Sequence, residues 1–144
     1  MRDRYHEALG GVVDRVLDLF GLVEEAISGA TVALLTADRE LAEDVIAKDL
    51  AIDAQCRDLE AATIELQMRQ QPVAHDLRLL LAAQRIVADL ERAGDLAKNI
   101  AKQIRRRAPD LVVPERMSDT VDAMGRAAVV LIRKAAHVFA DQDA

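Results

Sequence analysis

Aromatic residues are almost missing from this sequence. Tryptophan is absent, one tyrosine and two phenylalanines are present, and aromatic residues make up 2% of the chain. Apolar residues nevertheless make up 51% of the 144 residues, so the core is built from aliphatic side chains. A chain of this length can bury one ordinary core, and a composition rich in alanine, leucine, arginine and glutamate favours helices. We therefore expect an all-α protein.

Other scarce features exclude several functions. The single cysteine, Cys56, cannot form an internal disulfide, which is typical of a reducing compartment. The net charge of −6 gives no general attraction to nucleic acid or to an anionic membrane surface. The N-terminus shows no signal-peptide pattern, and the longest uncharged run, Ala26 to Ala37, is too short to span a bilayer. We expect a cytoplasmic protein without a transmembrane segment.

The spacing of apolar residues, alternately three and four, predicts four amphipathic helices. The first runs from about residue 4 to residue 36, and Asp38 can cap the second. The third ends in three arginines at 105–107, where cations complement the helix dipole. The apolar seam predicted for the second helix is Leu41, Val45, Ile52, Leu59 and Leu66. That of the third helix is Leu79, Ala83, Ile86, Leu90, Ala93, Ala97, Ile100 and Ile104. That of the fourth is Met117, Val121, Met124, Ala128, Leu131, Ala135 and Val138.

Prolines mark the breaks between these helices. Pro72 lacks a backbone N–H and disfavours helix at the preceding residue, so the second helix ends there. Pro109 and Pro114 lie in a short linker over residues 108–116. Helices that fold back at these points form an antiparallel three-helix bundle over residues 1–107, followed by one extra C-terminal helix.

Two pairs of carboxylates stand four residues apart, Asp49 with Asp53 and Glu91 with Asp95. Both pairs are equally far from Pro72, so the antiparallel bundle places all four acids at one level. Like charges at this spacing repel by roughly 0.2–0.5 kcal/mol per pair, which a bound cation relieves. The predicted seams put all four on the outer face of the bundle. Oxygen ligands of this kind favour Mg, Mn, Ca or ferric iron.

Ordinary surface ion pairs are the alternative to a metal at these acids. Arg57 follows Asp53 by four residues, Lys98 follows Asp95 by three, and Arg92 is next to Glu91. Exposed pairs of this kind contribute about 0–1 kcal/mol and need have no function. A carboxylate-bridged di-iron four-helix bundle is a further alternative, but no glutamate here has a histidine three residues later, as that site requires.

Gly94 lies in the middle of the third helix, beside the second acid pair. Glycine there costs about 1 kcal/mol relative to alanine, so we expect a neighbouring helix or a ligand to approach it closely. The stretch His75 to Arg78 resembles the phosphoacceptor box of histidine kinases. No Thr-Pro follows it and no nucleotide-binding motif is present, so we interpret His75 as a solvated histidine in a first helical turn.

Three stretches of the third helix and the turn before it carry a resemblance to a known family. Residues 71–78 (QPVAHDLR), 89–95 (DLERAGD) and 99–100 (NI) are similar, in order and separation, to the central signature of the PhoU family of phosphate-signalling regulators. The resemblance covers Arg4 to about Arg107. It implies two tandem three-helix bundles, of which residues 1–107 are the first, 108–116 the linker and 117–144 the first helix of an incomplete second.

The resemblance also implies a site and a role. Family members carry an acidic motif pair described as holding iron or zinc clusters, which falls here on Asp49, Asp53, Glu91 and Asp95. The family implies a regulator, not an enzyme, that links a phosphate ABC transporter to a sensor histidine kinase and represses the phosphate-starvation response. Membrane association then comes only through these partners. An adaptor that binds no metal remains the alternative.

Partner surfaces are expected at two places. The candidate partner-binding residues on the third helix are Asp76, Arg78, Arg92 and Asn99. The fourth helix has an apolar face that a lone first bundle leaves without an obvious partner, and such faces mark interaction surfaces. We expect this helix to pack on the first bundle or on a second copy, and we favour self-association into a homo-oligomer such as a homodimer.

Overall fold

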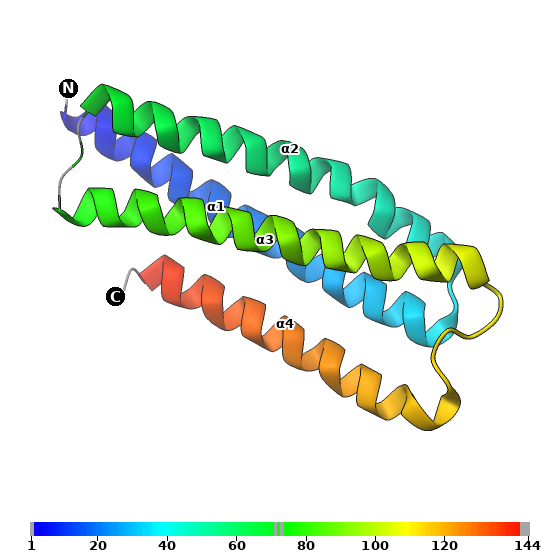
Figure 1. The fold of residues 1–144 in the computed structure, drawn as a ribbon. Helices are drawn as coiled ribbons and strands as arrows, with labels where there is room; N and C mark the ends of the chain where they lie inside the picture. The colour runs from blue at the N-terminus through cyan, green and yellow to red at the C-terminus, as the bar shows by residue number, and fades with distance from the viewer. Residues whose placement is uncertain (1, 71, 73, 142–144) are drawn as a thin grey trace.

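Four long helices run alternately up and down, side by side (Figure 1). They are α1 (Arg2–Thr36), α2 (Arg39–Gln70), α3 (Ala74–Arg107) and α4 (Ser118–Asp141), and a single-turn 3-10 helix, η1 (Glu115–Met117), precedes α4. This computed structural model describes residues 2–70, 72 and 74–141, and no strand occurs among them. The predicted all-α class is confirmed, as is the set of three mutually packed helices followed by one more.

The connection between α1 and α2 is a compact helix-ending motif. Ala37 adopts a positive φ of 53°, and the Asp38 N–H donates to the Ala33 carbonyl at 3.2 Å. This pairing across a left-handed residue is the Schellman arrangement, which satisfies carbonyls at the end of a helix. The Asp38 carboxylate then accepts the Leu41 N–H at 3.0 Å. Asp38 is therefore the N-cap of α2, as predicted.

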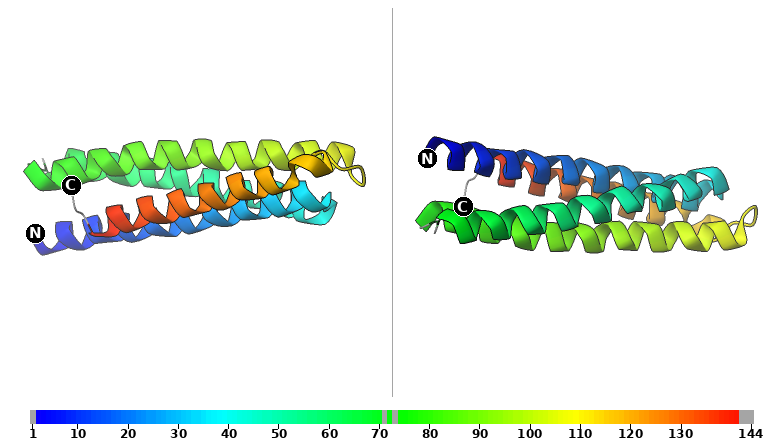
Figure 2. Two further views of the ribbon diagram at one scale, coloured as in Figure 1. Left: turned by 90° about the horizontal axis from the view of Figure 1, so that it is seen from below. Right: turned by 90° about the horizontal axis from the view of Figure 1, so that it is seen from above.

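The core lies between α1, α2 and α3 and is aliphatic. Its fully buried large side chains include Val16, Leu19, Val23, Ile52, Leu59, Leu80, Val87 and Ile104. Helix α4 packs along α1, and α2 lies at the opposite edge of the molecule (Figures 1 and 2). Within the described chain α4 makes no comparable contact with α2 or α3. Helix α1 is thus packed from two sides.

Helix α1 is long and apolar enough, from Arg4 to Thr36, to cross a membrane by the criteria of length and composition alone. A core helix of a bundle meets the same criteria. Helix α1 contacts each of the other three long helices, and residues such as Leu19 and Val23 are fully buried there. A share of 33% of its most apolar 18-residue window is buried in this packing.

The predicted seams of α2 and α3 are confirmed in part. On α2, Val45, Ile52 and Leu59 are buried as predicted, and Leu41 and Leu66 pack against the core while partly exposed. On α3, Leu79, Ile86 and Ala93 are only partly buried and Ile100 is 39% exposed, so half of that predicted seam is wrong. The buried seam of α3 is Leu80, Ala83, Val87, Leu90, Gly94, Ala97, Ala101 and Ile104. That of α2 is Ala42, Val45, Asp49, Ile52, Cys56, Leu59 and Thr63. A helix that packs on two neighbours has a wide apolar surface, so spacing alone leaves the rotation about its axis uncertain.

The predicted seam of α4 is also wrong. Met117, Met124, Leu131 and Val138 are 45–66% exposed. The face that packs on α1 carries Ile132, Ala136 and the buried Phe139, whose ring lies 6.5 Å from that of Phe20. Of the two expected arrangements, packing on the first bundle is the one observed.

Two residue pairs define this contact between α1 and α4. Arg133 of α4 forms an ion pair with Glu24 of α1 at 2.5 Å. Gly125 lies so close to Thr31 that a Cβ atom at this glycine would clash with the threonine side chain. Glycine at position 125 is therefore required for the observed approach of the two helices.

Candidate carboxylate site

Three of the four predicted acids come together between α2 and α3. Asp49 and Asp53 of α2 and Asp95 of α3 each offer a carboxylate oxygen, and these oxygens all lie within 4.8 Å of one another. Glu91 is partly buried one turn earlier on α3, and it does not belong to this group in the described structure. We call Asp49, Asp53 and Asp95 the carboxylate site.

Asp49 is buried, which contradicts the prediction that all four acids lie on the outer face. Only 3% of its surface is exposed, because the buried face of α2 is wider than predicted and also includes the row Asp49, Cys56 and Thr63. Its Oδ2 accepts a hydrogen bond from Lys98, whereas its Oδ1 has no partner among the described residues. A buried polar atom left unpaired costs about 1–3 kcal/mol. The site therefore contains a buried oxygen that a cation could satisfy.

Lys98 of α3 bridges two of the three acids. Its Nζ lies 2.5 Å from Asp49 Oδ2 and 2.6 Å from Asp95 Oδ1. The hydrogen bonds to Asp49 and then to Asp95 raise the pKa of Lys98 above its ordinary value, so its ammonium stays charged. The predicted pairing of Asp95 with Lys98 is confirmed. Within residues 2–70, 72 and 74–141, Asp53 forms no ion pair with Arg57 and Glu91 none with Arg92.

Gly94 allows α2 to approach α3 at this level. A Cβ atom on Gly94 would lie 3.3 Å from Ile52 Cγ2 and 3.5 Å from Asp49 Oδ1. The predicted close approach at this glycine is therefore confirmed, and the approaching element is α2. A side chain at position 94 would fill the space beside the unpaired oxygen of Asp49.

Cys56 lies one turn beyond Asp53 on α2 and is not a ligand of this site. Its Sγ lies 4.0 Å from the Val87 carbonyl oxygen. Burial, and after it the charges of Glu91 and Asp53, raises the pKa of the Cys56 thiol to about 12. The thiol stays protonated at neutral pH, so Cys56 is not an activated nucleophile.

Known proteins resemble this chain in sequence and in architecture. Residues 16–104 match the model of the PhoU domain. The chain belongs to the PhoU family. The "phosphate-specific transport system accessory protein PhoU homolog 2" of Mycobacterium tuberculosis is 40% identical over 143 residues, which are 99% of this chain and 67% of that relative. Homolog 1 of Mycobacterium leprae is 39% identical over 143 residues, 99% of this chain and 64% of that relative.

A solved structure agrees with these matches. The crystal structure of PhoU from Pseudomonas aeruginosa superposes with a TM-score of 0.86 at 29% identity, covering 96% of this chain and 66% of the other. The resemblance identified from the sequence signature is confirmed. This PhoU-family chain spans about two thirds of the length of the relatives that it matches.

The donor set of the carboxylate site in this PhoU-family chain is suited to a hard cation. Carboxylate oxygens favour Mg²⁺, Mn²⁺, Ca²⁺ or ferric iron, while structural zinc sites usually include thiolate or imidazole. Three carboxylates outnumber the single ammonium of Lys98, so the site retains excess negative charge. With the unpaired Asp49 Oδ1, these observations fit a bound metal ion.

The candidate partner-binding residues of the PhoU-family chain lie on α3 and outside this site. Arg78, Arg92 and Asn99 are exposed, and Asp76 is partly buried in the first turn of the helix. None of these four residues takes part in the carboxylate site. A molecule that contacts them would therefore leave the carboxylate site undisturbed.

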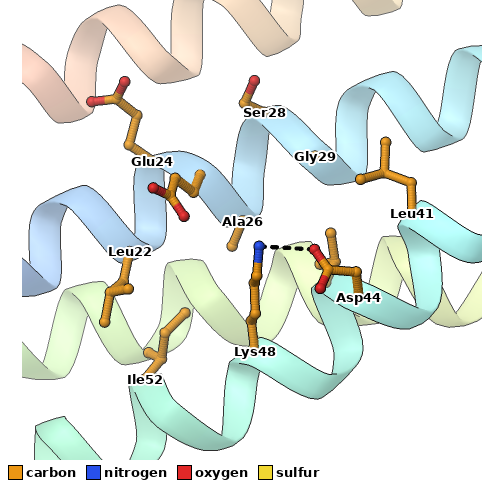
Figure 3. Close-up of a pocket in the computed structure, with 11 residues that line it drawn as sticks. Leu22, Glu24, Ala26, Ser28, Gly29, Leu41, Asp44, Lys48 and Ile52 are labelled. Carbon is orange, nitrogen blue, oxygen red and sulfur yellow. Dashed lines mark ion pairs between the residues drawn. The ribbon is translucent and has the colours of Figure 1, made fainter.

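A separate hollow of about 360 Å³ lies between α1 and α2 (Figure 3). Its floor is apolar and includes Leu22, Ala26, Leu41, Val45 and Ile52. At its rim Lys48 pairs with Asp44 at 2.8 Å. Sequence reasoning did not find this hollow, because its outline depends on the exact separation of the two helices.

Proposed function

We propose that this chain is a regulatory adaptor of phosphate uptake and signalling, not an enzyme. The observation that carries the proposal is the match, over 143 residues, to relatives named phosphate-specific transport system accessory proteins. In this role the chain couples a phosphate ABC transporter to a sensor histidine kinase in the cytoplasm and represses the phosphate-starvation response. Residues 1–107 form the first bundle of the family, and 117–144 the first helix of the second.

The adaptor uses a metal ion held by the carboxylate site. Asp49, Asp53 and Asp95 supply its oxygen ligands, and Glu91 is the further carboxylate of the motif pair. The unpaired, buried Oδ1 of Asp49 supports this assignment. Iron or zinc follows from the family resemblance, and manganese or magnesium from the oxygen ligands. The ion, when bound, supplies positive charge that ties α2 to α3.

A metal-independent adaptor is the second candidate, and one observation favours it. Lys98 already joins α3 to α2 through Asp95 and Asp49. In this alternative the ammonium is the permanent cation of the site and Asp53 is a solvated acid. The two candidates differ in metal content and not in the partners they predict.

Elemental analysis separates the two candidates. The purified protein is dialysed and its metals are measured by mass spectrometry, beside a variant carrying Asp49→Asn, Asp53→Asn, Glu91→Gln and Asp95→Asn. The metal site predicts iron, zinc or manganese that the variant loses. Protein that stays free of metal after reconstitution leaves the metal-independent adaptor.

The adaptor role needs its own test. The chain is expressed in a bacterium whose own PhoU gene is deleted, and a phosphate-starvation promoter is followed with a reporter at high phosphate. We expect restored repression. A well-folded chain at normal abundance that leaves the promoter fully active contradicts the proposed role.

A further inference from the structure

Helix α3 carries a row of arginines on its outer face. Arg78, Arg85, Arg92 and Arg106 occupy positions spaced by multiples of seven, with Asn99 at the remaining position, and all five are exposed. Residues seven apart lie almost directly above one another on a packed helix, about 10 Å apart along its axis. We call these five residues the arginine stripe.

The guanidinium groups of the stripe are not used within the molecule. Some cations elsewhere in the chain pair with carboxylates, as Arg105 does with Glu43 and Arg133 with Glu24. In the part of the chain that the structure describes, no arginine of the stripe forms an ion pair. This holds even for Arg85 and Arg92, which flank the exposed Asp89 in sequence. In a chain of net charge −6, the stripe places four guanidinium groups on one helix face, with the single carboxylate of Asp89 between Arg85 and Arg92.

Apolar side chains accompany the stripe. Leu81 is 48% exposed and Leu96 65% exposed on the same side of α3. A shallow hollow of about 750 Å³ lies over Ala82 and Ala88, and its walls are Arg78, Leu81, Gln84 and Arg85. Exposed arginine beside a small apolar hollow is typical of the residues that anchor protein–protein interfaces.

The stripe is free along the whole bundle. Helix α3 packs on α1 and α2, and α4 makes no comparable contact with it in the described chain (Figure 1). The stripe extends from Arg78 in the first turns to Arg106 in the last turn, which at 1.5 Å per residue is roughly 40 Å. A surface of this shape, long and one helix wide, fits another helix laid along it.

We propose that the arginine stripe binds an acidic amphipathic helix of a partner protein, with carboxylates at seven-residue spacing on the guanidinium groups and an apolar side chain in the hollow. The proposal rests on the adaptor function proposed above and gives a chemical class to the partner of Arg78, Arg92 and Asn99. Guanidinium groups suit this role because they bind carboxylates with two parallel hydrogen bonds. Asp89 lies between Arg85 and Arg92 on this face, and a partner helix can place an uncharged or basic side chain opposite it, whereas a uniformly anionic membrane surface cannot.

The test uses a fluorescein-labelled helical peptide with glutamate at every seventh residue and leucine beside each glutamate. Binding to the full chain is followed by fluorescence anisotropy, with a peptide carrying lysine for glutamate as the charge control. The stripe variant is Arg78→Glu, Arg85→Glu and Arg92→Glu. The matched control variant, Arg39→Glu, Arg116→Glu and Lys134→Glu, changes the net charge equally at exposed positions elsewhere.

We expect the glutamate peptide to bind the unaltered chain and the control variant with similar Kd, and the lysine peptide not to bind. The Kd of the glutamate peptide should rise about tenfold or more in the stripe variant, because three charge pairs are lost. For the unaltered chain the Kd should rise with salt concentration, because the same charge pairs are screened. Circular dichroism checks that the variants keep their helicity. Replacement of the same arginines by glutamine repeats the test with milder changes.

Three results overturn the proposal. The first is equal affinity of the stripe variant and the unaltered chain for the glutamate peptide. The second is stripe-dependent binding to phosphatidylglycerol vesicles but not to the peptide, and the third is a dimer that only the stripe variant dissociates. Metal content and promoter repression are measured on the same variants. A chain that restores repression without binding the peptide overturns the stripe proposal and leaves the adaptor function standing.

Discussion

The ammonium of Lys98 lies 2.5 Å from the buried carboxylate of Asp49, a residue 49 positions earlier in the chain. The pair joins the first half of α2 to the last third of α3, and Asp49 is 3% exposed there. A carboxylate in such a place depends on its counter-ion, since removing one partner leaves an uncompensated charge in the core.

Replacement of Lys98 by methionine should therefore destabilise the protein. We expect a loss of about 3 kcal/mol in the free energy of unfolding, measured by urea titration with a chelator present, because Asp49 loses its cation. Lys48→Met is the control, since the Lys48–Asp44 pair is exposed and contributes about 0–1 kcal/mol. The double variant Asp49→Leu with Lys98→Met should recover most of the loss. Equal stability of the Lys98 and Lys48 variants would contradict this account.

The Cys56 thiol should make stability fall at alkaline pH. Its pKa is raised from 9.0 to about 12 in the folded chain, so above about pH 9 the unfolded chain releases a proton that the folded chain retains. The stabilising contribution is complete below the unfolded pKa and declines as pH rises toward the folded one, at up to about 1.4 kcal/mol per pH unit. Urea titrations between pH 8 and about 11 should show a shallower decline for Cys56→Ala than for the unaltered chain. Lys98, whose pKa is also raised, contributes a decline of the same sign at higher pH in both proteins.

Replacement of glycine by alanine should have opposite effects on stability at positions 125 and 21. Gly125→Ala should cost about 1–3 kcal/mol, because the new Cβ clashes with Thr31 and forces α4 away from α1. Gly21→Ala should stabilise by roughly 0.5–1 kcal/mol, since its Cβ would have open space and alanine is the better helix former. Both are read from urea titrations. A neutral Gly125→Ala would show that α4 does not pack on α1 in solution.

The exposed face of α4 should mediate self-association. Met124, Leu131 and Val138 are 60–66% exposed at seven-residue spacing, the pattern of a helix–helix seam. Met124→Glu with Leu131→Glu should convert an oligomer to a monomer in sedimentation velocity at unchanged helicity. Ala123→Glu with His137→Glu, at exposed positions outside this row, is the matched control on the same helix. An unaltered chain that sediments as a monomer at all accessible concentrations sinks the prediction.

Helix boundaries were accessible from the sequence because local chemistry sets them. Asp38 caps α2 with its own carboxylate, and Pro72 cannot continue a helix. The same break at Pro72 predicted that the acids of α2 and α3 lie at the same height along the bundle, since both pairs are equally far from this proline. These features need no knowledge of which side of a helix faces the core.

The face that each helix turns toward the core was harder to predict from the sequence than the helix boundaries. The α2 seam was drawn through aliphatic residues only, which left out Asp49, Cys56 and Thr63 and placed Asp49 at the surface. Their spacing of seven, in step with Ile52 and Leu59, was the available signal of a polar row inside the core. On α4 the most regular apolar row is exposed, because periodicity identifies a face without saying what covers it.

Helix α1 is shared between two contacts, and this has a mechanical consequence. Glu24 is held by Arg133 of α4 on one side and lines the hollow between α1 and α2 on the other. A molecule that shifted α4 along its axis would act on the Glu24–Arg133 ion pair. It would thereby displace Glu24 at the hollow without contacting the hollow itself. Helix α1 thus connects the contact with α4, which includes the ring of Phe20 against that of Phe139, to the hollow on its other side.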